Sequence, residues 1–252
     1  LIIPSSVTQI GEYAFYNCHS LKQITIPSSV TVINQNTFCG CLSLKKIEIP
    51  SSITKIGDYA FSNCKSITKI EIPKSVKSIN YCTFCNCTSL TSVKIPTSVT
   101  SIKGHAFSGC ESLIEITIPS SVTFIGDCAF NSCHSLVKVS ILSSLTEINN
   151  NVFSNCHSLK EISLPSSVKT IKFGAFSHCI SLYQIKLPPS LISISNEVFH
   201  GCTSLKQIVI PSSVEFLGNG VFCDCESIEQ ITIPPLVKVI KNKLFLNCKS
   251  LQ

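Results

Sequence analysis

The sequence predicts a mainly β solenoid of about eleven stacked turns, each 23 residues long, with short parallel strands and short helical or 3-10 turns. Three regularities lead to this prediction. A phenylalanine recurs every 23 residues from Phe15 to Phe245, a cysteine follows each one by three residues, and a serine follows by five. No insertion breaks this register in any of the eleven units. An unbroken period of this length is typical of chains whose units stack only on their neighbours.

Each unit contains two short extended segments. In the unit that begins at Leu21, the alternation Ile24, Thr25, Ile26 has the period of a half-buried strand. Pro27 lacks an amide donor and has a fixed φ, so it ends this strand and starts a turn. Residues 30–33 are rich in β-branched side chains and predict a second short strand. Because the pattern recurs, we expect two parallel β ladders along the whole chain.

Two further positions predict local backbone conformation. The residue after the second strand is Gly or Asn in seven of the eleven units, which favours a left-handed backbone there. Lys103 and Lys172 are among the exceptions, so the conformation is not strictly required. The segment around each phenylalanine, such as residues 60–64, lacks a β-branched run and predicts a single helical turn.

Composition excludes several classes of protein. The formal net charge is +6, but every basic residue is Lys, and the lysines are scattered among fourteen acidic residues. Proteins that read nucleic acids rely on the bidentate guanidinium of Arg, so we expect no nucleic-acid partner. No apolar run approaches the 18 or so residues of a spanning helix, so we expect no direct membrane insertion by this segment.

The ends of the chain fall within repeats. Residues 1–252 are therefore interpreted as a single solenoid domain from a longer protein, with any signal peptide or anchor lying outside it. Neither end carries a polar capping unit, and an uncapped solenoid exposes strand edges and apolar faces. We expect the isolated segment to fray at its ends or to associate end to end.

Sixteen cysteines require an explanation, and eleven of them form a column in register with the phenylalanines. This column comprises Cys18, Cys41, Cys64, Cys87, Cys110, Cys133, Cys156, Cys179, Cys202, Cys225 and Cys248. We expect free thiols that pack as small buried side chains. The even count favours the alternative of a disulfide scaffold, but parallel neighbours about 4.8 Å apart are wider than the Cβ separation of a disulfide. The redox state of Cys39, Cys82, Cys85, Cys128 and Cys223 stays open.

No motif indicates catalysis or a cofactor. Cys82 and Cys85 have a zinc-like spacing beside Cys87, yet no second pair matches them, so we expect no metal. His178 lies next to Cys179, but adjacent side chains rarely point at one another. Motifs of hydrolases, metalloproteases and phosphate-binding loops are absent. We predict that the protein is not an enzyme.

The repeat resembles a known family. Residues 113–133 read Leu-x-x-Ile-x-Ile-Pro-x-Ser-Val-x-x-Ile-Gly-x-x-Ala-Phe-x-x-Cys, which resembles the BspA-like class of leucine-rich repeats, and the match covers the whole chain. Leu142, Pro189, Pro235 and Leu244 are its small departures. The resemblance implies a curved right-handed solenoid with parallel strands on its inner face. It also implies a surface protein of a bacterium or protist that adheres to host proteins or other cells.

The predicted function is protein recognition through the outward side chains of the first strand. In each unit the two residues that flank its buried middle residue face outward. The charged candidates are Lys46, Glu48, Lys69, Glu71, Lys94, Glu115, Lys138, Glu161 and Lys186. Their partners would be host matrix or cell-surface proteins, and the protein would be secreted or held at the cell surface. The alternative is a cytoplasmic scaffold or a purely structural array, which the thiol content favours because secreted chains usually oxidise their cysteines.

Overall fold

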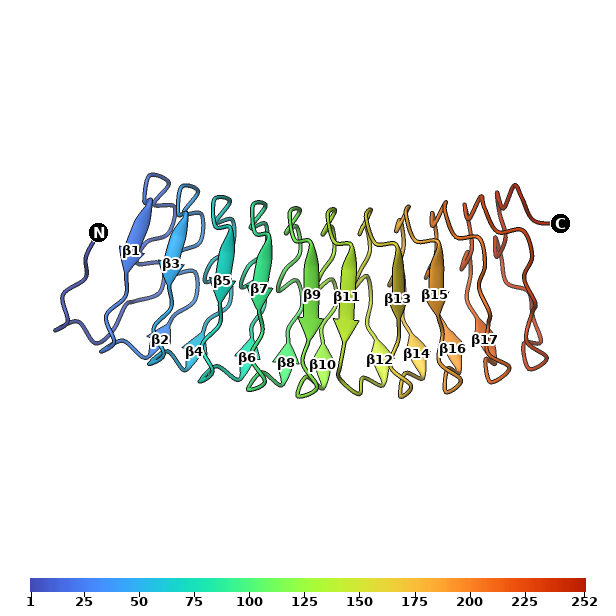
Figure 1. Ribbon diagram of the computed structural model, residues 1–252, viewed down its shortest axis with the longest axis horizontal. Helices are drawn as coiled ribbons and strands as arrows, with labels where there is room; N and C mark the ends of the chain where they lie inside the picture. Colours follow the sequence, from blue (N-terminus) through green and yellow to red (C-terminus); the bar gives the residue numbers. More distant parts are fainter.

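The coils stack into an elongated, gently bowed rod with the two termini at opposite ends, as the computed structural model shows for all residues from 1 to 252 (Figure 1). Successive units lie side by side along the rod, which confirms the predicted β solenoid. No helix capable of crossing a membrane is present.

The first ladder lies along the face turned toward the viewer in Figure 1. Its eight strands are β1 (Gln23–Thr25), β3 (Lys46–Glu48), β5 (Lys69–Glu71), β7 (Ser92–Lys94), β9 (Glu115–Ile118), β11 (Lys138–Ile141), β13 (Glu161–Ser163) and β15 (Gln184–Lys186). Paired strands are parallel and join the same repeat position, as in Ile24 with Ile47. The middle residue of a strand points into the core and its two neighbours point outward, as the alternation predicts.

The second ladder follows each Pro-containing turn. Its nine strands are β2 (Val32–Ile33), β4 (Lys55–Ile56), β6 (Ser78–Ile79), β8 (Ser101–Ile102), β10 (Phe124–Ile125), β12 (Glu147–Ile148), β14 (Thr170–Ile171), β16 (Ser193–Ile194) and β17 (Phe216–Leu217). The turn before it closes through an amide-to-carbonyl bond such as Val30 to Pro27 (3.0 Å). In eight units, from Ser29 to Ser213, a serine hydroxyl of this turn donates to a carbonyl of the preceding coil.

Regular strands extend over fewer turns than the eleven repeats of the sequence. The first coil contributes only a bridge from Ile2 to Thr25, and the first ladder ends at a bridge from Gln184 to Gln207. The first coil has a neighbour on one side only, so its short strand has half the hydrogen bonds of an inner strand. The strand ladders therefore describe about eight turns, although the repeat continues to the end of the chain.

The predicted helical turn at each phenylalanine is wrong, because two residues of this segment, two positions before and two positions after the phenylalanine, have a left-handed backbone. We use the name Phe turn for the six residues around each recurring phenylalanine. The Phe turn begins two residues before the phenylalanine and ends at the cysteine three residues after it. In the Phe turn of Phe61, both Tyr59 and Asn63 have a positive φ (56° and 58°). The amides of Tyr59, Phe61 and Asn63 donate to carbonyls of the next coil at 2.7–2.9 Å, whereas those of Ala60 and Ser62 donate within their own coil.

Every second amide of the Phe turn therefore points along the axis of the rod, toward the next coil. The same three inter-coil bonds recur at all ten junctions between Phe turns, from Tyr13 to Asp224. An α-helix directs all its amides along its own chain and would leave the neighbouring coil unpaired. Stacking therefore decides the local conformation, and Asn, Asp, His and Gly recur at the left-handed positions because they tolerate it best.

The prediction of a left-handed backbone at the Gly or Asn after the second strand is also wrong. Neither Gly126 nor Asn149 has a positive φ; the left-handed residues lie two positions later, at Cys128 and Asn151. The backbone amide of Gly126 donates to a carbonyl of the preceding coil at 2.8 Å, and a Cβ on this glycine would lie 2.4 Å from a backbone nitrogen. At Asn149 the side-chain amide makes the equivalent bond, to Ile125 at 2.6 Å. Close approach of the coils, and not φ, explains the preference.

Phenylalanines and cysteines form two columns through the core. Consecutive rings from Phe15 to Phe245 have centroids 5.3–5.8 Å apart with planes within 14° of parallel. Each cysteine from Cys41 to Cys248 donates its thiol to the phenylalanine carbonyl of the preceding coil, with Sγ–O distances of 3.0–3.4 Å. All sixteen cysteines are free thiols. The column cysteines thus add a directional bond between coils to their apolar packing.

One coil departs from this regularity, at the position where Leu142 replaces the repeat proline. Its amide donates to the carbonyl of Ile118 at 3.0 Å, a bond that proline lacks the hydrogen to make. Strands β9 and β11 each extend to four residues as a result. Beside it, the hydroxyl of Ser143 is buried without a hydrogen-bond partner.

The thiol column makes stability sensitive to alkaline pH. Burial raises the pKa of Cys87, Cys133 and Cys179 to about 12, against 9.0 for an ordinary thiol. Above pH 9 the unfolded chain loses these protons while the folded chain keeps them, so the free energy of unfolding falls between pH 9 and pH 12 by up to ~1.4 kcal/mol per thiol per pH unit. Urea denaturation at increasing pH should show a shallower fall when the three cysteines are replaced by Ala. An equal slope would contradict the prediction.

The close approach of coils at Gly126 gives a second test. In Gly126→Ala the new methyl group meets backbone, so we expect a loss of about 1–3 kcal/mol in the free energy of unfolding, measured by chemical denaturation. The matched control is Gly11→Ala, at the same repeat position of the first coil, where nothing lies within 4 Å of the added Cβ. A similar loss in both variants would contradict the assignment of the effect to the close approach of the coils at Gly126.

Candidate functional site

The outward side chains of β1 to β15 form one continuous surface, which we call the first-strand face. All nine charged residues predicted from the sequence lie on it and are exposed. They project from a ladder whose register is constant, with Lys69 beside Ser92 and Glu71 beside Lys94. The backbone therefore holds these side chains in fixed rows, while their identity changes from coil to coil.

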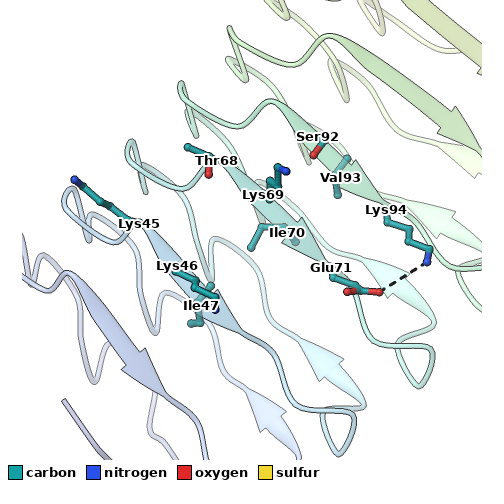
Figure 2. Close-up of a pocket in the computed structure, with 10 residues that line it drawn as sticks. All are labelled: Lys45, Lys46, Ile47, Thr68, Lys69, Ile70, Glu71, Ser92, Val93 and Lys94. Carbon is teal, nitrogen blue, oxygen red and sulfur yellow. Dashed lines mark ion pairs between the residues drawn. The ribbon is translucent and has the colours of Figure 1, made fainter.

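A shallow hollow of about 620 Å³ lies on this face over β3, β5 and β7. Figure 2 shows Lys69 on the middle strand, with Lys94 reaching toward Glu71 across the strand pair. The Nζ of Lys94 is 3.8 Å from the Glu71 carboxylate, and that of Lys46 is 2.8 Å from Glu48 on its own strand. The Glu48 hydrogen bond raises the pKa of Lys46, and Lys46 lowers that of Glu48. Exposed pairs of this kind stabilise the fold little, so these charges are available to a partner.

The structure adds a third row that the sequence analysis missed. The residue directly before the first strand is also exposed on this face in seven of the eight strands, including Lys45, Ile114, Val137 and Tyr183. Reading the strand pattern one residue further toward the N-terminus would have found it. The row brings apolar and aromatic groups into a surface for which the sequence analysis named only charged candidates.

Tyr183 is the main aromatic group of this row. Its hydroxyl donates to the carboxylate of Glu161 on the neighbouring strand at 3.3 Å. It borders two hollows, one of about 530 Å³ lined by Val137 and Leu142, and one of about 830 Å³ lined by Val209. The side chain of Val209 is 82% exposed. A tyrosine between apolar hollows is the type of anchor that protein interfaces favour.

The cysteines singled out in the sequence as potential metal ligands do not come together, whereas another group of potential ligands does. Cys82 and Cys85 interact with each other and with Tyr59, but Cys87 is buried and donates to the carbonyl of Phe61. They do not form a three-ligand site. One group of potential metal ligands does occur, away from the first-strand face, and comprises His200, Cys223 and Asp224. His200 lies 23 residues before Cys223 in sequence, so a search for local ligand spacing misses the group.

The adjacent His178 and Cys179 do not form a nucleophilic pair. Cys179 is fully buried and donates to the carbonyl of Phe153 at 3.1 Å, whereas His178 is exposed. Burial raises the pKa of this thiol to about 12, which opposes formation of a nucleophilic thiolate.

A solenoid of stacked short strands with a varied outer surface on a constant core defines a leucine-rich-repeat protein, a class that generally serves as a protein-interaction scaffold. Comparison with models of known protein families gives the same class and identifies one family within it. The model described as the BspA type leucine rich repeat region (6 copies) matches residues 8–137 and 123–252. The chain belongs to the BspA-type leucine-rich-repeat family.

Three solved structures illustrate the likeness. A leucine-rich repeat protein from Bacteroides ovatus is 38% identical, with a TM-score of 0.86 over 92% of this chain and 62% of the other. A leucine rich cell surface protein from Faecalibacterium prausnitzii is 30% identical, with a TM-score of 0.59 over 100% of this chain and 86% of the other. The pneumococcal vaccine antigen PcpA is 22% identical, with a TM-score of 0.66 over 100% and 76%, and shares the fold.

The chain spans less than two thirds of the Bacteroides ovatus protein that it matches. No curated protein matches it.

The contact between Tyr183 and Glu161 can be tested by titration. The negative charge of Glu161 raises the pKa of Tyr183. We expect Glu161→Gln to return this pKa toward its ordinary value of 10.0. The titration of Tyr183 is measured by NMR of ring-labelled tyrosine. The control is Glu147→Gln, which removes a carboxylate paired with Lys172 on the second ladder and should leave Tyr183 unchanged. An unchanged titration in Glu161→Gln would place the two side chains apart in solution.

Proposed function

We propose that this chain is an adhesion module, exposed at the cell surface or secreted, that binds a protein partner along the first-strand face. The observation that carries the proposal is the contrast between the two sides of the ladder. The inward residues are Ile or Val in every strand, whereas the outward residues vary among Lys, Glu, Gln, Ser and Thr. A rigid surface with variable exposed side chains is what repeat proteins present to extended partners.

The composition of the face indicates the kind of partner. Charges of both signs line it, and the apolar hollows beside Tyr183 lie toward its C-terminal part. Tyrosine buries a large rigid ring at small entropic cost, while the surrounding charges set register and partner choice. A protein segment with complementary charges and one or two apolar side chains fits this surface. Its binding weakens as salt increases.

The surface location rests on the family. The Faecalibacterium prausnitzii relative is described as a cell surface protein, and PcpA as a vaccine antigen. Both descriptions support an extracellular setting for this chain. A cytoplasmic scaffold is the second candidate, and the sixteen free thiols favour it. Labelling of intact source cells with a membrane-impermeant amine-reactive ester distinguishes the two, since a surface protein is labelled and a cytoplasmic one is not.

Charge reversal tests the binding face. A partner is first isolated with the folded chain from extracellular matrix and cell-surface extracts. Lys69→Glu, Lys94→Glu and Lys138→Glu together should then weaken its binding at least tenfold, measured by surface plasmon resonance, because three attractive contacts become repulsive.

The control carries the same charge change elsewhere. Lys55, Lys77 and Lys169 are exposed on or beside second-ladder strands, and their replacement by Glu should leave affinity unchanged. Circular dichroism establishes that both variants fold. Equal affinity of the two triple variants would move the site to another face of the solenoid.

A further inference from the structure

Three potential metal ligands converge in the Phe turns near the C-terminal end of the rod. His200 follows Phe199, and Cys223 and Asp224 follow Phe222 in the next coil. The ligand atoms of the three side chains all lie within 4.8 Å of one another. The Nε2 of His200 is 3.6 Å from Oδ2 of Asp224, and the Sγ of Cys223 is 3.2 Å from the same oxygen.

These separations suit a tetrahedral zinc ion. Zinc bonds of about 2.0–2.3 Å to nitrogen, oxygen and sulfur give tetrahedral edges of about 3.3–3.6 Å between ligand atoms. The edges from Asp224 to His200 and to Cys223 are already close to these lengths. The third edge, from His200 to Cys223, is at most 4.8 Å. The set of one nitrogen, one sulfur and one oxygen is of the type that zinc binds.

A second histidine approaches from the coil before. The ring centroids of His178 and His200 are 4.9 Å apart in an edge-to-face arrangement. In the next coil, the repeat position of His178 is occupied by Gly201. A Cβ on Gly201 would lie 2.5 Å from Nδ1 of His178. Glycine therefore leaves room for the His178 ring to lie over the coil of His200, on the side toward Asp224. His178 therefore offers a second nitrogen donor beside His200, next to the group of three whose ligand atoms lie within 4.8 Å of one another.

The carboxylate is held in position by a neighbour. Asn247, one coil further on, donates its side-chain amide to Oδ1 of Asp224 at 2.7 Å and leaves Oδ2 directed toward His200 and Cys223. A bond of this kind to the oxygen that does not ligate is what orients carboxylate ligands in metal sites. Cys223 is 5% exposed, so the sulfur lies in a sheltered position at the base of the group.

We propose that His200, Cys223 and Asp224 bind one zinc ion, with His178 as the fourth ligand and Asn247 as the residue that positions Asp224. Binding breaks the S–H bond of Cys223, releases its proton to solvent and forms a zinc–thiolate bond. His200 and His178 bind through neutral nitrogens. The thiol hydrogen that Cys223 now donates to Asp224 is thus replaced by the metal.

The site ties three coils together where strand pairing is weakest. Its ligands come from the Phe turns of Phe176, Phe199 and Phe222, and beyond Gln207 the first ladder has no regular strand. Since repeat units contact only their neighbours, a bond that spans three coils opposes fraying from this end. The metal stabilises the folded chain by mass action because the unfolded chain does not assemble the site.

The test uses the reduced chain with Co²⁺ as a spectroscopic probe and Zn²⁺ as competitor. We expect one Co²⁺ per chain, with thiolate-to-cobalt charge transfer in the near ultraviolet, a visible spectrum of tetrahedral intensity, and displacement by one equivalent of Zn²⁺. Zinc should also raise the melting temperature. Failure to bind either ion, or a cobalt spectrum without the thiolate band, would overturn the proposal.

Variants separate this site from incidental binding. Cys223→Ser and His200→Ala should abolish the thiolate band and the zinc-dependent rise in melting temperature, and Asn247→Ala should weaken zinc binding by about 10- to 100-fold. The matched control is Cys39→Ser, at the same repeat position in a coil without histidine ligands, which should bind zinc as the parent does. Melting of each variant without metal establishes that it folds. Equal zinc affinity in Cys223→Ser and Cys39→Ser would contradict the assignment.

Discussion

The backbone hydrogen bonds from one Phe turn to the next are the interaction on which the rest of the structure depends. A single 23-residue unit has too few apolar side chains to offset the entropy of ordering it. Stacking supplies three amide-to-carbonyl bonds per junction in the Phe turn alone, together with the strand ladders, the serine bonds and the cysteine thiols. Only residues that preserve this stacking can occupy the inward positions, which explains why the repeat is so uniform.

The same constraint leaves the outer surface free. Outward side chains of the first strands take no part in stacking, so their identity changes from coil to coil without cost to the fold. The face of Lys69, Glu71 and Lys94 and the hollows beside Tyr183 are therefore surfaces that can be tuned for a partner. The Phe turns illustrate the same freedom at a second place. Their residues beside the phenylalanine differ from coil to coil, and near the C-terminal end His200, Cys223 and Asp224 lie together.

Local departures from the repeat have local effects because each coil contacts only its neighbours. Leu142 lengthens the strand pair β9–β11 and leaves one serine hydroxyl unpaired, yet the Phe turns above and below it keep their inter-coil bonds. In the same coil, the side-chain amide of Asn149 makes the inter-coil bond that a backbone amide makes at Gly126. Both changes alter individual hydrogen bonds between two coils, and the remaining inter-coil bonds keep the coils stacked.

The sequence by itself determined the period, the two ladders, the direction of each first-strand side chain and the family, because all of these follow from the spacing of apolar residues within one unit. Only the tertiary structure decided the conformation of the Phe turn, the role of Gly126 and Asn149, the row of Tyr183 and the grouping of His200 with Cys223 and Asp224. Those features depend on what the neighbouring coil places a few ångströms away. Local propensity favoured a helical turn around Phe61, but the need to direct alternate amides at the next coil outweighed it.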